Sequence, residues 1–371
     1  MTLAMVVAVL SVFTYGMVIV IPGSIKLRLV ERVNLDDAQM GRVITLWQVT
    51  TLVLTLAVGA VMDAVGHRPV LVCGFLFVGL AICCFAMVRR PIGVFAAAAL
   101  LGVGGSCVNT GGNTLLPALS PSNPAAASNL GNVFFGLGAF VVPFLISFLF
   151  KRLRYSVAVA IFGVAAFCGI IPALVARYPP VRSVYQLSAA VSLLGNNSVI
   201  VAGVMLFCMV GIEVSLASWT TTYFRKIGFA DHRASLVFSM LWACKIVGRL
   251  IAAQVVTTEI GKTAIQVTSL ASAVGLLILT LTMNQRVAVA CVALLGLVFG
   301  PVFPTTVGVT FAKFSPSLYG SIFAIIYSVG LLGSSLVPAL IGYYSKIRSI
   351  RTGYGILAML AALLFVFAWA L

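Results

Sequence analysis

Charged residues are scarce in this sequence: they make up only 8% of its 371 residues, and only 7 of them are acidic. A soluble domain carries roughly 25% charged residues. With 62% hydrophobic residues and a mean hydropathy of +1.18, the chain does not have the composition of a soluble domain. We expect a multi-pass integral membrane protein that is embedded in the lipid bilayer of a cell inner or plasma membrane.

Patterns that indicate other classes of protein are also missing. All 8 cysteines sit inside apolar stretches without paired spacing in loops, so neither a disulfide framework nor a zinc site is indicated. No nucleophile accompanied by a base is found, and the Lys and Arg residues are scattered rather than interleaved with aromatic residues. We therefore expect no enzyme activity, no cofactor, no metal and no nucleic-acid partner. The first apolar stretch lacks a basic leader and is long enough to span, so we expect a retained helix.

Long apolar stretches dominate what is present. A helix needs about 20 mostly apolar residues to cross a bilayer. Such stretches lie at 3–25, 38–62, 69–88, 91–117, 125–150 and 154–176, and again at 197–224, 232–258, 262–283, 286–313, 317–344 and 350–371. The sequence predicts an all-α membrane protein of twelve transmembrane helices. It divides into a six-helix bundle at 1–176, a linker at 177–196 and a second six-helix bundle at 197–371.

The two halves form an internal repeat. A shift of 195 residues aligns Trp47 with Trp242, Gly66 with Gly261, and the pair Val142-Pro143 with Val337-Pro338. Matches spread over so many predicted helices indicate two parallel, pseudo-symmetric bundles. Transporters built from parallel repeats hold the solute near the bilayer midplane at the repeat interface, and access alternates as one repeat rocks against the other.

The turn after the second predicted helix carries a specific motif, which runs from Gly59 to Arg68. The spacing of Gly59, Asp63, Gly66 and Arg68 resembles the loop signature of the major facilitator superfamily, a class of twelve-helix secondary transporters. Asp63 lies five residues before Arg68, so the pair is expected to be able to interact across the turn. The resemblance implies the major facilitator fold and a gating role for these four residues. The second copy of the motif has Thr258 in place of Asp63, so a gate contact is expected from the first copy.

Other stretches resemble the fucose and glucose/galactose permease branch of this superfamily. They are Asn132 to Gly138 followed by Pro143, Gly211 to Val214 with Trp219, Trp242 to Arg249, and the pair Asn109-x-x-x-Asn113. This resemblance implies a sugar:cation symporter. The chain has Asn132 where many relatives carry a histidine, and its first and fourth predicted helices lack a carboxylate. Those helices therefore do not supply a coupling acid.

Glu213 is the only carboxylate that falls deep within a predicted membrane helix. A carboxylate at that depth costs about 2.5 to 3.5 kcal/mol on insertion scales unless it is paired, hydrated or protonated. We expect Glu213 to be a proton- or cation-coupling group or a ligand of solute hydroxyls. The alternative is a structural ion pair with Lys245 or Arg249, and both roles can hold.

Lys245 and Arg249 lie four residues apart, on one face of the eighth predicted helix. Two cations on one face of a membrane helix must point toward water or toward Glu213. We expect Lys245 to take part in solute binding and ion coupling, and Arg249 to have a structural or gating role. The same two cations support an alternative function, an organic-anion or drug transporter.

Uncharged polar residues at helical spacing extend the candidate site. Amides offer planar donors and acceptors to hydroxyl groups, and tryptophan offers a flat face to a sugar ring. The predicted substrate-binding residues are Gln48, Asn109, Asn113, Asn129, Asn132, Glu213, Trp219 and Lys245. The alternative for any one asparagine is an interhelical hydrogen bond, worth about 0.6 kcal/mol in membranes.

The basic residues conflict with the orientation that the resemblance implies. Most of them fall on the side opposite to the Gly59 to Arg68 turn, in loops that include Arg89, Arg90 and Lys151. The positive-inside rule would place that side in the cytoplasm, whereas the resemblance places the turn there. We keep the orientation of the resemblance. An organelle membrane or a basic rim that gathers anionic solutes would account for the difference.

We therefore expect a monomeric secondary active transporter that moves a small polar solute, a sugar, by alternating access. Coupling to a proton or a sodium ion is expected at Glu213. A non-transporting membrane sensor is less favoured, because the sequence shows no soluble domain through which it would signal.

Overall fold

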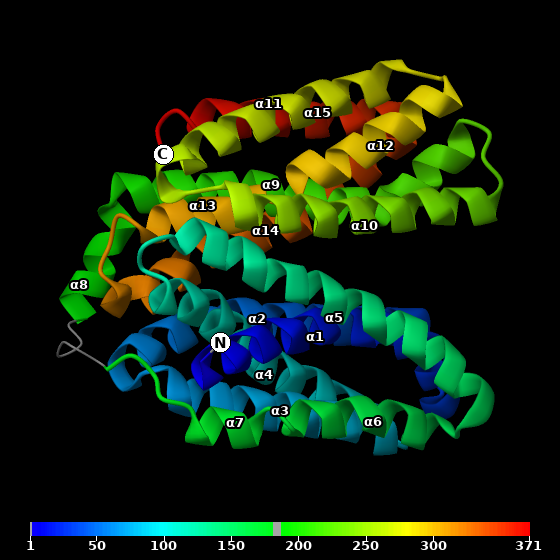
Figure 1. Ribbon diagram of the computed structural model, residues 1–371. Coiled ribbons are helices and arrows are strands. Elements are labelled where there is room, and N and C mark those ends of the chain that lie inside the picture. The colour runs from blue at the N-terminus through cyan, green and yellow to red at the C-terminus, as the bar shows by residue number, and fades with distance from the viewer. Residues whose placement is uncertain (1, 181–186) are drawn as a thin grey trace. The chain divides into compact units, whose positions relative to one another are not determined.

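The computed structural model describes residues 2–180 and 187–371 (Figure 1). Within these residues, 12 helical segments are long and apolar enough to cross a membrane. The prediction of an all-α protein with twelve membrane-spanning segments is confirmed.

The first six spans are built from seven helices, and the sixth span is interrupted at Cys168 and Gly169. The helices are α1 (Leu3–Val33), α2 (Asp37–Val65), α3 (His67–Met87), α4 (Pro91–Leu119), α5 (Pro124–Arg152), α6 (Tyr155–Phe167) and α7 (Ile170–Val175). The predicted linker at 177–196 follows, of which residues 181–186 lie outside the described part of the chain.

The second six spans are preceded by two short helices, and the tenth span is interrupted at Gly300 and Pro301. In order, the elements are α8 (Leu187–Ser192), η1 (Leu193–Gly195), α9 (Asn197–Lys226), α10 (Asp231–Val255), α11 (Thr258–Leu281), α12 (Gln285–Phe299), α13 (Val302–Phe311), η2 (Pro316–Leu318), α14 (Tyr319–Ile347) and α15 (Ile350–Phe367).

Polar residues at the predicted turns define where several helices begin. At the start of α2, the Asp36 carboxylate accepts the Gln39 backbone N–H, and the Gln39 side chain accepts the Asp36 N–H in return. Asn196 caps α9 and Thr257 caps α11 more simply, each through a side-chain oxygen that accepts from the backbone of the first turn. The few polar residues of the chain thus stop one helix and start the next.

Two helices run further than the sequence predicts. Helix α1 continues beyond residue 25 to Val33 and ends at Asn34, which has a φ of 57°. Helix α2 continues through Asp63 to Val65, so the loop expected between residues 62 and 69 is reduced to Gly66. Gly66 reverses the chain by itself because its φ of 85° is accessible to glycine.

The helices are organised in two compact units, and each contains one segment from the other half of the sequence. Unit 1 comprises residues 1–119, 134–187 and 316–324, and unit 2 comprises residues 120–133, 188–315 and 325–371. The first turns of α5 belong to unit 2, and the first turns of α14 belong to unit 1. These two exchanged segments correspond under the shift of 195 residues. The bundle boundaries at 176 and 197 stay a prediction.

The repeat is visible in the packing within each unit. In unit 1, a Cβ atom at Gly102 of α4 would lie 3.0 Å from the Trp47 carbonyl oxygen of α2. In unit 2, a Cβ atom at Gly296 of α12 would lie 2.6 Å from the Leu241 carbonyl oxygen of α10. The same close helix contact is therefore made twice, by residues that the internal repeat aligns within one position.

Candidate functional site

Glu213 on α9 and Lys245 on α10 form an ion pair inside unit 2. The Lys245 Nζ donates to Glu213 Oε1, and the two side chains are only 4% and 17% exposed respectively. The Lys245 Nζ also lies 4.2 Å from the centroid of the Trp242 ring, which adds a cation–π contact. The structure thus contains the ion pair that the sequence offers as an alternative, and the coupling role of Glu213 stays a prediction.

Arg249 connects three helices of unit 2 through backbone carbonyls. Its side chain is buried, its Nε donates to the Gly300 oxygen at 3.0 Å, and one terminal nitrogen donates to the Asn132 oxygen at 3.0 Å. Gly300 is the residue at which α12 ends. Its carbonyl is one of those left without an intrahelical partner when a helix stops. Arg249 therefore stabilises the interruption of the tenth span.

The charged residues of this cluster occur in the second half of the sequence only. Under the shift of 195 residues, Glu213, Lys245 and Arg249 correspond to Val18, Thr50 and Leu54. The repeat that preserves the packing glycines has not preserved these charges. The Glu213, Lys245 and Arg249 cluster therefore has no charged counterpart in the first repeat.

Two asparagines of α5 lie in unit 2 as well. Asn129 is fully buried, and its Nδ2 donates to the Thr305 hydroxyl of α13 and to the Ala125 oxygen, both at 2.9 Å. Its Oδ1 has no hydrogen-bond partner among the described residues. Asn132 is 5% exposed and donates to the Ser128 oxygen at 3.0 Å. The amide oxygen of Asn129 is thus a buried acceptor without a partner among the described residues.

Asn109 and Asn113 are neighbours on α4 in unit 1. The Asn113 Nδ2 donates to the Asn109 Oδ1 at 2.8 Å and to the Asn109 backbone oxygen at 3.0 Å. This leaves the Asn109 Nδ2, on a residue only 2% exposed, without an acceptor in the described part of the chain. A buried donor without a partner costs about 1 to 3 kcal/mol. Gln48, on α2 of the same unit, is exposed.

Trp219 lies on another side of α9 from Glu213. Its Nε1 donates to the Pro338 oxygen of α14 at 3.4 Å, and its ring lies against Gly342. The polar atom of this side chain therefore has a partner in the protein. These contacts do not test the predicted role of Trp219 in binding solute, which stays a prediction.

The gating motif places a carboxylate against the start of another helix. Asp63, in the last turn of α2, accepts the backbone N–H groups of Gly320 at 2.8 Å and of Ser321 at 2.7 Å, in the first turn of α14. All of these residues belong to unit 1. The first N–H groups of a helix have no intrahelical acceptor, and the helix dipole favours an anion there. Asp63 thus caps α14 from a separate helix.

Gly59 makes this approach possible. A Cβ atom at Gly59 would lie 2.4 Å from the Gly320 oxygen and 2.4 Å from the Ala324 Cβ. A Cβ atom at Gly320 would in turn lie 2.4 Å from the Gly59 oxygen. The two helices therefore touch backbone to backbone, which brings the short Asp63 side chain within reach of the α14 amides.

Arg68 has different partners from those that the motif alone suggests. Its terminal nitrogen donates to the Ala176 oxygen at 3.1 Å, and its guanidinium lies 5.8 Å from the centroid of the Tyr178 ring. The Tyr178 ring also stacks parallel to that of His67. Burial raises the pKa of Tyr178 to about 12, and its neutral hydroxyl donates to the Ala173 oxygen. Arg68 thus holds the end of the sixth span, while Asp63 binds α14.

The sequence of the chain matches the family model of the Major Facilitator Superfamily over residues 4–338. The chain belongs to the major facilitator superfamily. It is accordingly a multi-pass integral membrane protein of a transporter family. No curated protein sequence gives a significant match.

Solved structures share the major facilitator fold over nearly the whole chain. The E. coli fucose:proton symporter has 16% identity and a TM-score of 0.81, with 98% of this chain and 97% of that chain covered. A proton:xylose symporter bound to 6-bromo-6-deoxy-D-glucose has 13% identity and a TM-score of 0.76, with coverages of 99% and 94%. A human organic anion transporter has 15% identity and a TM-score of 0.74, with coverages of 99% and 98%. These likenesses confirm the fold, and they include the branch whose motifs the sequence resembles.

Asn123 is a residue of this major facilitator protein that sequence reasoning missed. Its Nδ2 donates to the Val256 oxygen at the end of α10, and its Oδ1 accepts the Ala126 N–H in the first turn of α5, both at 3.2 Å. It thus joins α10 to the start of α5, as Asp63 joins α2 to the start of α14. Thr258, aligned with Asp63 by the repeat, has a hydroxyl without a partner among the described residues. The sequence could have shown that Asn123, which stands before Pro124, caps α5. It could not have shown the hydrogen bond from Asn123 to α10, because the repeat gives no sign of it.

Proposed function

We propose that the protein is a secondary active transporter that moves a sugar across the membrane by alternating access, coupled to protons through Glu213. The observation that carries the proposal is the largely buried Glu213–Lys245 pair, made by the carboxylate that the sequence places deep within a predicted membrane helix. Membrane carboxylates of this kind mark ion pathways and proton relays. In this proposal the moving bodies are the six-helix bundles at 1–176 and 197–371, and the protein acts as a monomer.

Proton coupling follows from what the pair does when its charge changes. While Glu213 is ionised, the Lys245 ammonium neutralises it and the two side chains remain together. When a proton binds the Glu213 carboxylate, the attraction to Lys245 is lost, and the lysine is left as an unmatched cation at a buried position. Breaking a buried pair in this way costs about 3 to 5 kcal/mol. That energy is large enough to shift a conformational equilibrium by more than a hundredfold.

Sugar as the solute is supported by the polar atoms left over in each unit. Asn109 offers an amide donor and Asn129 an amide acceptor, both on buried residues, and neither atom has a hydrogen-bond partner among the described residues. Sugar hydroxyls both donate and accept, so a hydroxyl can pair with either kind of amide atom. A site built for hydroxyls also rejects solutes that lack them, because its polar groups would stay unpaired.

The alternative of an organic-anion transporter rests on Lys245 and Arg249. The Lys245 ammonium is neutralised by Glu213, and Arg249 donates to two backbone oxygens. An anionic solute would therefore have to displace interactions that each cation already makes. These contacts favour the uncharged polar solute.

Counterflow in proteoliposomes tests the proposal. Vesicles loaded with one unlabelled compound are diluted into its labelled form, with a panel of pyranoses, small carboxylates and empty vesicles as controls. We expect transient accumulation for at least one sugar and none for the carboxylates. Counterflow of carboxylates alone would replace the sugar assignment with the organic-anion one, and absence of counterflow for every compound would contradict a transport function.

A further inference from the structure

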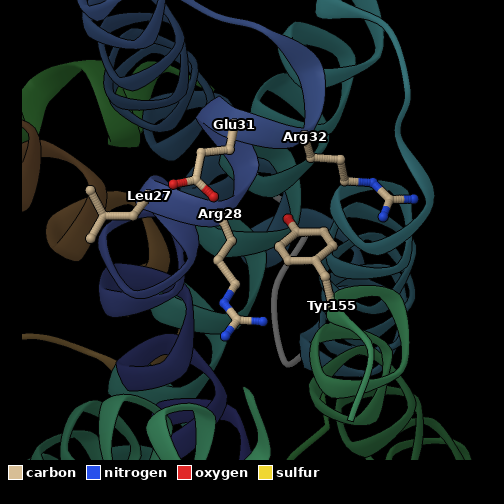
Figure 2. A pocket seen from close by; sticks show the side chains of 5 residues that line it. All are labelled: Leu27, Arg28, Glu31, Arg32 and Tyr155. Atoms are coloured by element: carbon tan, nitrogen blue, oxygen red, sulfur yellow. The ribbon is translucent and has the colours of Figure 1, made fainter. Parts of the chain in front are cut away.

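The last turns of α1 line an open cavity in unit 1, with a volume of about 610 Å³ (Figure 2). The residues that line it are Leu27, Arg28, Glu31, Arg32 and Tyr155. Ligand pockets commonly have volumes of about 300 to 1,000 Å³. None of these five residues belongs to the predicted solute site or to the gating motif.

Two arginines of the cavity are held by stacked aromatic rings. The Arg28 guanidinium lies 4.4 Å from the centroid of the Phe150 ring, and the Arg32 guanidinium lies 5.2 Å from that of Tyr155. The two rings stack on each other at 6.0 Å with an interplanar angle of 21°. In Figure 2 the Tyr155 ring is seen between the two guanidinium groups. Stacking of this kind orders both cations before any ligand arrives.

Hydrogen bonds to backbone oxygens fix the same three side chains. Arg28 donates to the Phe150 oxygen at 3.1 Å, Arg32 to the Val88 oxygen at 3.0 Å, and the Tyr155 hydroxyl to the Phe85 oxygen at 3.1 Å. A guanidinium has five N–H donors, and each arginine uses one of them in these bonds. The structure therefore presents two anchored guanidinium groups whose remaining donors are available to a ligand at the cavity.

The charge around the cavity is strongly positive. The residues whose carbonyls anchor the arginines are followed in sequence by further cations, at Arg89 and Arg90 and at Lys151 and Arg152. Glu31 is the only acidic residue that lines the cavity, and no ion pair joins it to Arg28 or Arg32 in the described part of the chain. Cationic clefts attract anions, and planar guanidinium forks match phosphate oxygens in particular.

The cavity lies where a lipid headgroup would be found. Arg28 and Arg32 occupy the last turns of the first membrane span, and Tyr155 begins the sixth. Leu27 lines the cavity with 78% of its surface exposed, which places an apolar side chain beside the cations. Tyrosine is enriched at the level of lipid headgroups at both membrane surfaces, and guanidinium forks match phosphate oxygens.

We propose that this cavity binds the phosphate group of an anionic membrane phospholipid. Arg28 and Arg32 bind the phosphate oxygens, Phe150 and Tyr155 hold the guanidinium groups, and Leu27 contacts the adjoining acyl chains. A soluble phosphate ester would use the same donors, so the source of the phosphate has to be distinguished by experiment. None of its residues belongs to the predicted solute site, and it gives a role to two of the basic residues on this side of the protein.

Binding of phosphatidylglycerol to the full-length protein in detergent tests the proposal. Thermal unfolding and native mass spectrometry are compared for dioleoyl-phosphatidylglycerol and dioleoyl-phosphatidylcholine. We expect the anionic lipid alone to raise the unfolding temperature. The R28Q and R32Q single variants should each bind it about tenfold more weakly, because each loses a charge-assisted hydrogen bond to a phosphate oxygen. The R28K/R32K variant should be intermediate, because lysine keeps the charge but loses the fork.

The second repeat supplies a matched control. In the second half of the sequence, Tyr223 and Ile227 stand at the positions that correspond to Arg28 and Arg32. Lys346 and Arg348, at the end of α14, correspond to Lys151 and Leu153. The K346Q/R348Q variant loses the same charge as R28Q/R32Q, and we expect it to keep phosphatidylglycerol binding. Equal losses in the two double variants, or no loss in R28Q/R32Q, would overturn the site. Arginine-dependent stabilisation by glycerol 3-phosphate alone would overturn the lipid assignment in favour of a soluble phosphate ester.

Discussion

Replacing Asp63 by asparagine should release the start of α14 from α2. The carboxylate accepts two backbone N–H groups, those of Gly320 and Ser321. An amide of the same shape keeps one acceptor oxygen, loses the charge and turns an NH2 group toward the other N–H. A hydrogen bond to a charged group is worth about 1.5 to 3 kcal/mol. We therefore expect a loss of about 2 kcal/mol or more in the free energy of opening this contact, a factor of about 30 in its opening equilibrium.

Hydrogen–deuterium exchange of the peptide that contains Gly320 and Ser321 measures this directly. In the Asp63→Asn variant these amides should exchange about 30-fold faster, because exchange follows the free energy of local opening. Thr258→Val is the matched control, since it changes the repeat-related position, where the hydroxyl has no partner among the described residues. Unchanged exchange at these two amides in Asp63→Asn would refute the capping role of the carboxylate. Slower counterflow in the same variant would connect the contact to conformational cycling.

Two further predictions concern side-chain amides. Asn123→Ala removes the hydrogen bond to the Val256 oxygen and the cap of α5, so it should lower the free energy of unfolding by about 1 to 2 kcal/mol; thermal unfolding should show a larger loss than for Thr258→Val, and equal losses would contradict this. Asn109→Ala and Asn113→Ala should each lower the affinity for the transported sugar about tenfold. The sugar-dependent shift in unfolding temperature measures this affinity, and unchanged shifts in both variants would show that these residues serve helix packing only.

Composition and periodicity were enough to predict the fold. The apolar stretches have the length of membrane helices, and polar residues such as Asp36 and Asn196 mark where helices begin. The repeat was readable because glycines such as Gly102 and Gly296 are needed at the same helix contact in each unit. The exact ends of α1 and α2 were not readable, because Arg28 and Asp63 look like loop residues when their tertiary partners are unknown.

The partners of polar side chains were harder to predict than their positions. Glu213 and Lys245 stood out because charge is rare in membrane helices, and their pairing follows from two neighbouring helices of one unit. Arg68 and Trp219 were predicted as gating and binding residues from their residue types. Each donates a hydrogen bond to a backbone oxygen, and sequence patterns do not reveal such a partner. Asn123 was missed for the same reason, since its partner is the carbonyl of Val256.

Proton-driven sugar uptake with and without the Glu213 carboxylate tests the central proposal most directly. Proteoliposomes with an imposed pH gradient are compared for the wild type, Glu213→Gln, and Glu259→Gln, which removes an exposed carboxylate in the first turn of α11. We expect the gradient to drive accumulation in the wild type and in Glu259→Gln. In Glu213→Gln it should drive none, while counterflow remains in part. Undiminished proton-driven accumulation in Glu213→Gln would contradict the assignment of Glu213 as the coupling residue.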